Sequence, residues 1–471
     1  MNTHAQTITL SLISHTNVGK TTLARTLLKR DIGEVRDATH VTDVSTAHEM
    51  IKSSEGHRLL LWDTPGFGDS IRLLRRLRQS ANGNPVGWFL HEVWDRWANR
   101  ALWCSQQAVR NVRDDADVVL YLVNAAESPG DAAYVEAEME ILGLLGRPVV
   151  VLLNHVGQDP AGAAAVTEAW NRHLRGRYEL VRQVTDLDAF SRCWTQEDAL
   201  LELVASLVDP VRQPAARLLA RAWRAQNVAR FEQSIDLLTT HLLRVAEDRE
   251  RLPTRRGLPL VLDRLSGRIR DDRVAAGRAL AERLDASSRQ TFEHLLRLHG
   301  LDGEAGEKIQ TSLRDAFVTG RGLDETSSAL LGGLVSGAIS GLAADFLAGG
   351  LTFGGGAVAG AILGASGATL VAKGYNLLQQ DAHAFLRWSP EMLLSFVRLA
   401  LLRYLAVAHF GRGRGGFREA AYPDAWPPLL DAVMAPRMEA VRTALEAVNA
   451  TALRRHLLSA ADSLLTSLHP H

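Results

Sequence analysis

The chain has 471 residues, and its 53 lysines and arginines balance 53 aspartates and glutamates, so the formal net charge is zero. A neutral chain argues against proteins that hold nucleic acid through bulk positive charge, so we expect no bulk nucleic-acid binding. The two cysteines lack metal-ligand spacing, which argues against a disulfide scaffold or a zinc site. No secretory signal is evident, and we expect a cytoplasmic protein.

Residues 1–210 alternate short apolar runs with helical stretches, which is the pattern of a mostly parallel sheet with helices on both faces. The candidate buried strands are residues 8–13, 59–62, 118–123 and 149–153. Gly56 separates residues 44–51 from the second of these strands, so the two segments are predicted to pair as an antiparallel hairpin. In open sheets of this kind, ligands bind at the carboxyl ends of the parallel strands, so we expect the ligand-binding residues in the motifs that follow these strands.

The first motif follows the strand at residues 8–13 and precedes a helical run at 22–29. Its sequence, SHTNVGKTT, predicts a P-loop, in which backbone N–H groups and the positive end of the next helix hold phosphate oxygens. Lys20 would reach the β- and γ-phosphates. Serine replaces the usual first glycine, which is tolerated where no positive φ is required. The predicted nucleotide-binding residues in this loop are Ser14, Asn17, Val18, Gly19, Lys20, Thr21 and Thr22.

A second motif, WDTPG, ends the strand at residues 59–62. Asp63 is placed to hold Mg²⁺ through water, and Thr21 would add its hydroxyl. The N–H of Gly66 is placed to meet the γ-phosphate. Two such motifs on separate strands, in this order, predict a nucleoside triphosphatase.

Together the motifs resemble the bacterial P-loop GTPases of the Era and TrmE type, and more closely a bacterial family that fuses such a domain to a C-terminal helical domain of unknown function. The segments that carry the resemblance are HTNVGKTTLARTLLKRDIGEVRDATHVTDV, LLLWDTPGFGDSIRLLRRLRQ, GWFLHEVWDRW and DDADVVLYLVNA. The resemblance is specific over the first 210 residues and looser beyond them. It implies that the chain binds GTP and GDP with Mg²⁺ and hydrolyses GTP.

The resemblance also assigns candidate roles to single residues. Thr42 matches the switch threonine that closes over Mg²⁺ and the γ-phosphate, with Thr39 as the alternative. Asn17 matches the asparagine that helps bind K⁺ in TrmE-like enzymes, where the cation supplies positive charge in the transition state. The candidate catalytic residues are therefore Lys20 and Thr42. The candidate metal ligands are Thr21, Thr42 and Asp63 for Mg²⁺ and Asn17 for K⁺.

Phe67 stands where Ras-like enzymes place a glutamine that orients the attacking water. A phenylalanine cannot orient water by hydrogen bonding, so we expect a low intrinsic rate of hydrolysis. The missing group would come from a cation, from a second copy of the domain in a homodimer, or from His91 or Arg96.

The motif for the nucleotide base is incomplete. Asn154 ends the strand at residues 149–153, where GTPases carry an Asn-Lys-x-Asp pattern. Gly157 replaces the carboxylate that pairs with guanine, and Asp159 lies two residues further on. GTP is the expected nucleotide, and ATP or relaxed specificity is the alternative.

Residues 71–115 separate two core strands and are predicted to form an insert of amphipathic helices. The insert carries four tryptophans, namely Trp88, Trp94, Trp97 and Trp103. They would pack the insert onto the sheet, or form a partner or dimer surface.

The rest of the chain is predicted to be helical over residues 211–325 and 377–471. A glycine-rich region at 326–376 separates these parts, and 13 of the 45 residues from Leu330 to Gly374 are glycine. Glycines at every fourth residue in each half predict a hairpin of two close-packed helices, which would insert into a membrane. The alternatives are a hairpin packed against the surrounding bundle and a disordered loop. The apolar run at residues 392–410 contains Arg398 and Arg403, so we expect a buried bundle helix there.

The fold predicted is thus an α/β P-loop GTPase domain followed by a large all-α region with a glycine-rich hairpin. The predicted function is a slowly hydrolysing GTPase switch whose insert relays the nucleotide state to a helical effector region. That region would associate with the inner (cytoplasmic) membrane or a membrane protein. The alternatives are a membrane-inserting or scaffold protein with little hydrolytic activity, and a ribosome- or RNA-associated assembly GTPase.

Overall fold

The computed structural model describes residues 5–16, 18–29, 32, 45–79, 84–91, 99–155, 160–187, 193–253, 268–301, 375–380, 383–409 and 425–469. The chain divides into two compact units. The first unit comprises residues 1–228 with 408–418 and 471, and the second comprises residues 229–407 with 419–470.

The first unit contains a six-stranded sheet in the order β2-β3-β1-β4-β5-β6. Its strands are β1 (Thr7–Ser14), β2 (Thr46–Lys52), β3 (Arg58–Asp63), β4 (Val118–Asn124), β5 (Val149–Asn154) and β6 (Val181–Asp186). Neighbouring strands are parallel except for the antiparallel pair β2 and β3. The predicted buried strands and the hairpin are confirmed. β1 lies between β3 and β4, so the strand order reverses at β1, and in open α/β sheets ligands bind at the carboxyl end of the strands at such a point.

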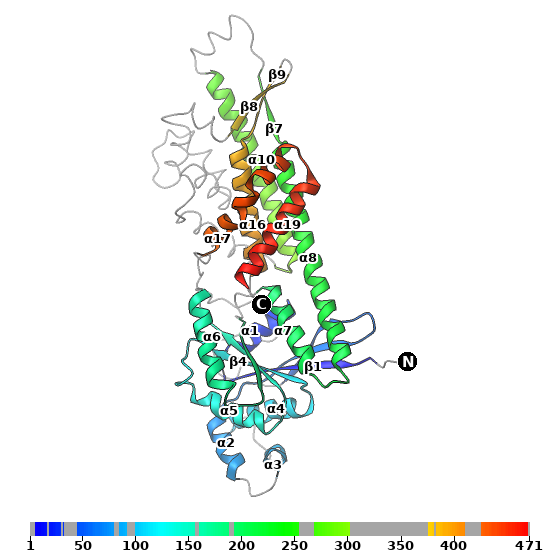
Figure 1. The fold of residues 1–471 in the computed structure, drawn as a ribbon, viewed down its shortest axis with the longest axis vertical. Helices are drawn as coiled ribbons and strands as arrows, with labels where there is room; N and C mark the ends of the chain where they lie inside the picture. The colour runs from blue at the N-terminus through cyan, green and yellow to red at the C-terminus, as the bar shows by residue number, and fades with distance from the viewer. Residues whose placement is uncertain are drawn as a thin grey trace, which may run out of the picture. The chain divides into compact units, whose positions relative to one another are not determined.

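Helices cover both faces of this sheet (Figure 1). One face packs against α1 (Lys20–Leu28), α7 (Trp194–Leu207) and the beginning of α8 (Gln213–Glu247). The other face packs against α2 (Ser70–Gln79), α3 (Pro85–His91), α4 (Arg100–Asp114), α5 (Ala133–Gly143) and α6 (Pro160–Leu174). The apolar strands are buried on both sides, which explains their continuous hydrophobic runs.

The predicted insert forms the helices α2, α3 and α4. On α2 the leucines Leu73, Leu74 and Leu77 are buried, while the arginines face outward or lie at the margin. Trp88 is partly buried against the core, and Trp103 is half-buried. These two tryptophans support the prediction that the insert packs onto the sheet. Trp94 and Trp97 lie outside the described residues.

The second unit is built mainly of helices, as predicted. Its helices are the end of α8, α10 (Arg268–Leu298), α16 (Pro390–Ala408), α17 (Trp426–Met434), the short 3₁₀ helix η1 (Ala435–Arg437), α18 (Met438–Glu446) and α19 (Ala450–Leu468). Helix α16 is buried along most of its length, including Arg403, so the buried bundle helix expected at residues 392–410 is confirmed.

This unit also contains a small antiparallel sheet that the helical periodicity did not predict. Its order is β7-β9-β8, formed by β7 (Arg249–Leu252), β8 (Tyr375–Gln380) and β9 (His383–Trp388). Glu250 pairs with Leu386, so β7 finds its partner more than a hundred residues further along the chain. Such a short, charged strand forms because a distant segment completes its hydrogen bonds. The hydrophobic pattern of neighbouring residues does not reveal that partner.

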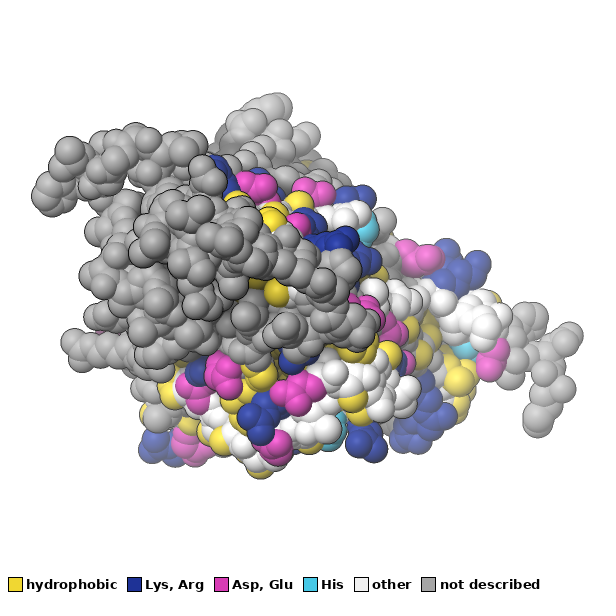
Figure 2. All heavy atoms as spheres, turned by 90° about the horizontal axis from the view of Figure 1, so that it is seen from above, with side chains coloured by type: hydrophobic (Ala, Val, Ile, Leu, Met, Phe, Trp, Pro, Cys, Tyr) yellow, Lys and Arg dark blue, Asp and Glu magenta, His cyan; other side chains and the backbone are white. Residues whose placement is uncertain are grey.

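Within the part of the chain that the structure describes, no helix is long and apolar enough to cross a membrane. Residues 326–374 of the predicted glycine-rich hairpin lie outside that part, and the last two residues of the hairpin belong to β8. On the face shown in Figure 2, acidic and basic side chains of the described residues are interspersed.

Candidate nucleotide-binding site

The loop between β1 and α1 lies at the carboxyl end of β1, which is flanked by the parallel strands β3 and β4. Gly19 precedes α1 with a φ of 99°, in the left-handed region that favours glycine. Ser14, the last residue of β1, is buried and is not among the described residues with positive φ. The serine at the usual glycine position is therefore compatible with the loop conformation.

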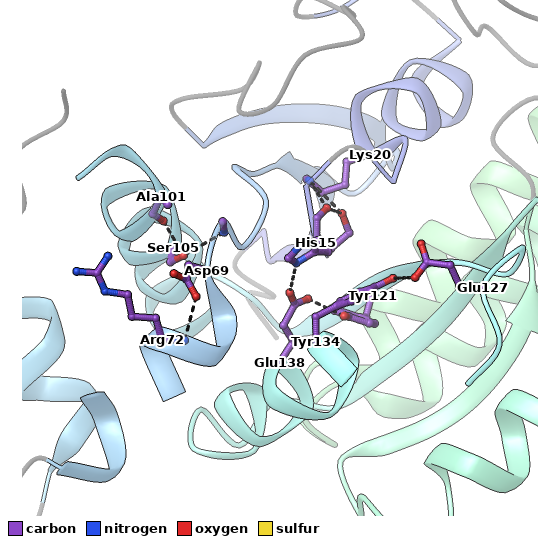
Figure 3. Close-up of polar contacts among 12 residues, drawn as sticks. His15, Lys20, Asp69, Arg72, Ala101, Ser105, Tyr121, Glu127, Tyr134 and Glu138 are labelled. Atoms are coloured by element: carbon purple, nitrogen blue, oxygen red, sulfur yellow. Dashed lines mark hydrogen bonds and ion pairs between the residues drawn. The ribbon is translucent and has the colours of Figure 1, made fainter. Parts of the chain in front are cut away.

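Lys20 reaches back over this loop. Its ammonium nitrogen Nζ donates to Ser14 Oγ at 3.0 Å and lies 3.4 Å from the carbonyl oxygen of His15 (Figure 3). Burial lowers the pKa of Lys20, and the negative charges of Asp63 and Glu138 partly oppose this shift. A buried ammonium beside a phosphate-binding type of loop is suited to an anionic ligand such as phosphate.

Thr21 and Asp63 face one another across the same edge of the sheet. Thr21 Oγ1 donates to Asp63 Oδ2 at 2.9 Å. Among the described residues, the second carboxylate oxygen of Asp63, Oδ1, is buried without a hydrogen-bond partner. Burial raises the pKa of Asp63, and the charge of Lys20 opposes that rise. A hydroxyl beside a carboxylate with an unused oxygen fits Mg²⁺, which prefers oxygen ligands.

Gly66 is packed directly against the loop. A Cβ atom at this position would lie 2.8 Å from Lys20 Nζ, 3.1 Å from the carbonyl oxygen of His15 and 3.1 Å from the Thr16 nitrogen. The next residue, Phe67, donates its N–H to the carbonyl oxygen of Ser14 at 2.9 Å. Its side chain is fully buried in the core on the α2–α6 face, so it is not available to orient water.

Asn154 connects the end of β5 to the same loop. Its amide nitrogen Nδ2 donates to the carbonyl oxygen of Val18 at 2.9 Å, and the side chain is fully buried. The structure thus brings this residue of the predicted base motif against the phosphate-binding loop. Gly157 and Asp159 lie outside the described residues.

The remaining predicted residues fall into two groups. Thr22 is buried within α1, and His91 is exposed at the end of α3. Asn17, Thr39, Thr42 and Arg96 lie outside the described residues. The candidate switch threonine, potassium ligand and arginine therefore stay predictions.

Sequence reasoning missed a buried carboxylate beneath the loop. Glu138 on α5 is fully buried, and its Oε1 lies 2.7 Å from Nδ1 of His15 (Figure 3). Tyr121 on β4 donates its hydroxyl to the other oxygen, Oε2, at 2.6 Å. One feature of the sequence could have indicated the burial of Glu138: it lies on the same apolar side of α5 as Val135 and Met139.

Residues 9–155 match the family described as 50S ribosome-binding GTPase. The first unit therefore contains a P-loop GTPase domain. The chain belongs to the family described as Domain of unknown function (DUF3482), whose match covers residues 177–456, more than half of the chain. No curated protein matches the chain.

Several solved structures are similar to the chain. One is Era in complex with MgGDPNP and nucleotides of 16S ribosomal RNA, at 12% identity over 54% of this chain and 75% of that chain, with a TM-score of 0.32. Another is a variant of Era from Aquifex aeolicus bound to GDP and AlF4⁻, at 13% identity over the same shares, with a TM-score of 0.32. A probable GTP-binding protein engB matches at 16% identity over 38% of this chain and 89% of that chain, with a TM-score of 0.26.

Proposed function

We propose that the chain is a molecular switch that binds GTP, hydrolyses it slowly, and controls its helical C-terminal region through the nucleotide state. The observation that carries the proposal is the convergence of Lys20, Thr21, Asp63 and Gly66 at the carboxyl ends of β1 and β3. Phosphoryl transfer uses an ammonium on the phosphates, oxygen ligands for Mg²⁺ and a glycine packed on the P-loop, and this site supplies each of them.

In this proposal each group has one task. The loop N–H groups and the Lys20 ammonium bind the β- and γ-phosphates, and Thr21 and Asp63 hold Mg²⁺, which neutralises charge on these phosphates. Thr42 as the switch threonine and K⁺ at Asn17 are part of the proposal on the strength of the Era and TrmE resemblance. The burial of Phe67 supports a slow rate, because its ring lies in the core and cannot position water.

Contacts around the loop suggest how the nucleotide state reaches other elements. The N–H of Gly68, two residues after Gly66, donates to Ser105 Oγ at 3.3 Å, and Ser105 donates to the carbonyl oxygen of Ala101 on α4 (Figure 3). Movement of the segment after Gly66 would therefore change a contact of the insert, which supports the insert as a relay.

A second connection starts at Lys29, which caps the C-terminal end of α1. Its Nζ donates to Asn227 Oδ1 on α8 at 2.7 Å and lies 5.0 Å from the centre of the Trp223 ring. The indole N–H of Trp223 donates to the buried Glu197 on α7 at 2.9 Å. Lys29 directly precedes the segment that contains Thr42, so this contact links the proposed switch to α8.

We also propose that the helical region associates with the cytoplasmic membrane through residues 326–376. The support is the composition of that segment, with glycines spaced for close helix packing and few charges. Carbonate extraction of membranes from cells that express the chain checks this proposal. Retention in the membrane pellet is expected, and release into the supernatant would contradict it.

Calorimetric titration with GTP, GDP and ATP in the presence of Mg²⁺ tests the central proposal. We expect GTP and GDP to bind the wild type, ATP to bind more weakly, and Lys20→Ala to weaken GTP binding about 100-fold, since it removes a charged hydrogen-bond donor. Lys52→Ala, on the exposed face of β2, is the matched control and should bind as the wild type does. Equal binding by Lys20→Ala, or no binding by the wild type, would contradict the proposal.

A further inference from the structure

The second residue of the P-loop, His15, is held on several sides. Its ring nitrogen Nδ1 lies 2.7 Å from Glu138 Oε1, and its ring packs against the Tyr134 ring with centroids 4.4 Å apart (Figure 3). Its main chain pairs with Phe67 in an isolated parallel bridge, and its carbonyl oxygen lies 3.4 Å from Lys20 Nζ. The position of His15 therefore fixes part of the loop that surrounds Lys20.

Glu138 holds this histidine from the protein interior. A carboxylate accepts hydrogen bonds, so Nδ1 of His15 carries the proton in this contact. Burying a carboxylate costs free energy unless partners compensate it, and here both oxygens are used, one by His15 and one by the Tyr121 hydroxyl. Burial and the neighbouring carboxylate raise the pKa of Tyr121, so the hydroxyl remains a donor to Glu138.

The carboxylate is itself rigidly placed. Glu138 lies on α5 between Val135 and Met139, which are both fully buried in the core. Tyr121 lies on β4, the strand adjacent to β1, and is also fully buried. Two core elements that carry no phosphate-binding motif thus determine where Glu138 points.

We propose that Glu138 is a positioning residue for nucleotide binding, which acts through His15 to hold the phosphate-binding loop in the conformation that receives the phosphates. The inference rests on the proposed function, because it assigns a new residue to the same site. Glu138 touches neither phosphate nor metal in this proposal. Its charged hydrogen bond orders the loop before the nucleotide arrives. Nucleotide binding then costs less conformational entropy.

Affinity for a fluorescent GDP analogue, measured for His15→Ala, Glu138→Ala and the double variant, tests the proposal. Each single variant is expected to bind about 10-fold more weakly, the effect of losing one hydrogen bond to a charged group. If Glu138 acts through His15, the double variant binds no more weakly than the weaker single variant. Additive losses, or unchanged affinity in either single variant, would overturn the proposal.

Two further variants separate positioning from a general structural role. Glu138→Gln keeps a group that accepts from His15 and should recover part of the affinity lost in Glu138→Ala, whereas an equal loss would count against the proposal. Glu136→Gln, the same change on the outward side of α5, should leave affinity unchanged. If Glu138→Ala does not fold, Tyr121→Phe replaces it, with a smaller loss expected and unchanged affinity contradicting the proposal.

Wild-type binding of the analogue is measured first. Its absence refutes the proposed function and this inference together. Binding by the wild type with unaffected variants refutes the role of Glu138 alone.

Discussion

Gly66 shows how closely the phosphate site is packed. A methyl group there would meet Lys20 Nζ at 2.8 Å and two backbone atoms of the P-loop at 3.1 Å. The lysine can shift, but the backbone contacts can be relieved only by moving the loop. We expect Gly66→Ala to weaken GDP binding at least about 10-fold, because it disturbs the loop and Lys20 together. Gly130→Ala is the control, since no atom lies within 4 Å of its Cβ position. Similar affinities of the two variants for a fluorescent GDP analogue would show that this packing is unimportant.

We expect His241 to make the stability of the second unit depend on pH. It is buried, with Nε2 lying 3.3 Å from Ser288 Oγ. Burial lowers its pKa from 6.5 to about 4, and the charges of Arg403 and Arg244 act in the same direction. Between pH 6.5 and about pH 4, the unfolded chain binds a proton at this histidine and the folded chain does not. The contribution of His241 to the free energy of unfolding is therefore complete above pH 6.5 and decreases as the pH falls toward 4.

From pH 7 to pH 5 this histidine alone should remove about 2 kcal/mol from the free energy of unfolding. Denaturant unfolding of the wild type and of His241→Gln at both pH values measures the effect. The variant should lose less stability than the wild type over this interval, because glutamine does not titrate. An equal loss of unfolding free energy in both proteins would show that titratable groups other than His241 cause the pH dependence.

The site residues that the sequence could predict are those that lie within short motifs. One short stretch of sequence contains Ser14, Gly19, Lys20 and Thr21. Phosphate binding by a P-loop requires these residue types in this order, so a local sequence pattern identifies them. Glu138 could not be assigned to the site in this way, because 123 residues separate it from His15 and only the folded sheet brings them together. Its place on an apolar helical stripe is a sign of burial, but it does not identify the partner.

At the scale of elements, α8 has a direct contact with the helix of the P-loop. Lys29 at the end of α1 contacts both Asn227 and the Trp223 ring, and Trp223 is bonded to Glu197. If nucleotide moves the segment after Lys29, the surroundings of Trp223 change. Its indole therefore serves as a natural reporter of the switch.

We expect a GTP analogue and GDP to give different tryptophan fluorescence in the wild type, and this difference to shrink in Trp223→Phe. Lys29→Met should also reduce the difference while nucleotide still binds, because it removes the cation from the ring. Arg221→Met removes an exposed cation from α8, the helix that carries Trp223, and is the matched control. A response that is unchanged by Lys29→Met would rule out this contact as a link.

The elements themselves could be predicted where their pattern is local. The buried strands and long helices follow from apolar runs and 3.6-residue periodicity, and the structure contains them. The strand β7 could not be found, because its sequence RERL has no strand pattern and its partner β9 lies far along the chain. Pairing, and not propensity, makes it a strand.

At the scale of the whole molecule, α8 contributes residues to both compact units, with Val228 in the first and Ala229 in the second. This helix carries the contacts of Trp223 and Asn227 with Lys29 and continues past Ala229 into the second unit. Under the proposed function, α8 is the element through which the GTPase domain would control the C-terminal region, since rigid helices can carry coupling between distant sites.

Hydrogen–deuterium exchange of the full chain, with GDP and with a non-hydrolysable GTP analogue, tests whether the nucleotide state controls the helical region. We expect backbone amides of the second unit, α8 after Ala229 above all, to exchange at different rates in the two states. Lys20→Ala should show no such difference. Identical exchange throughout the second unit of the wild type, with both nucleotides bound, would contradict the claim that the nucleotide state controls the helical region.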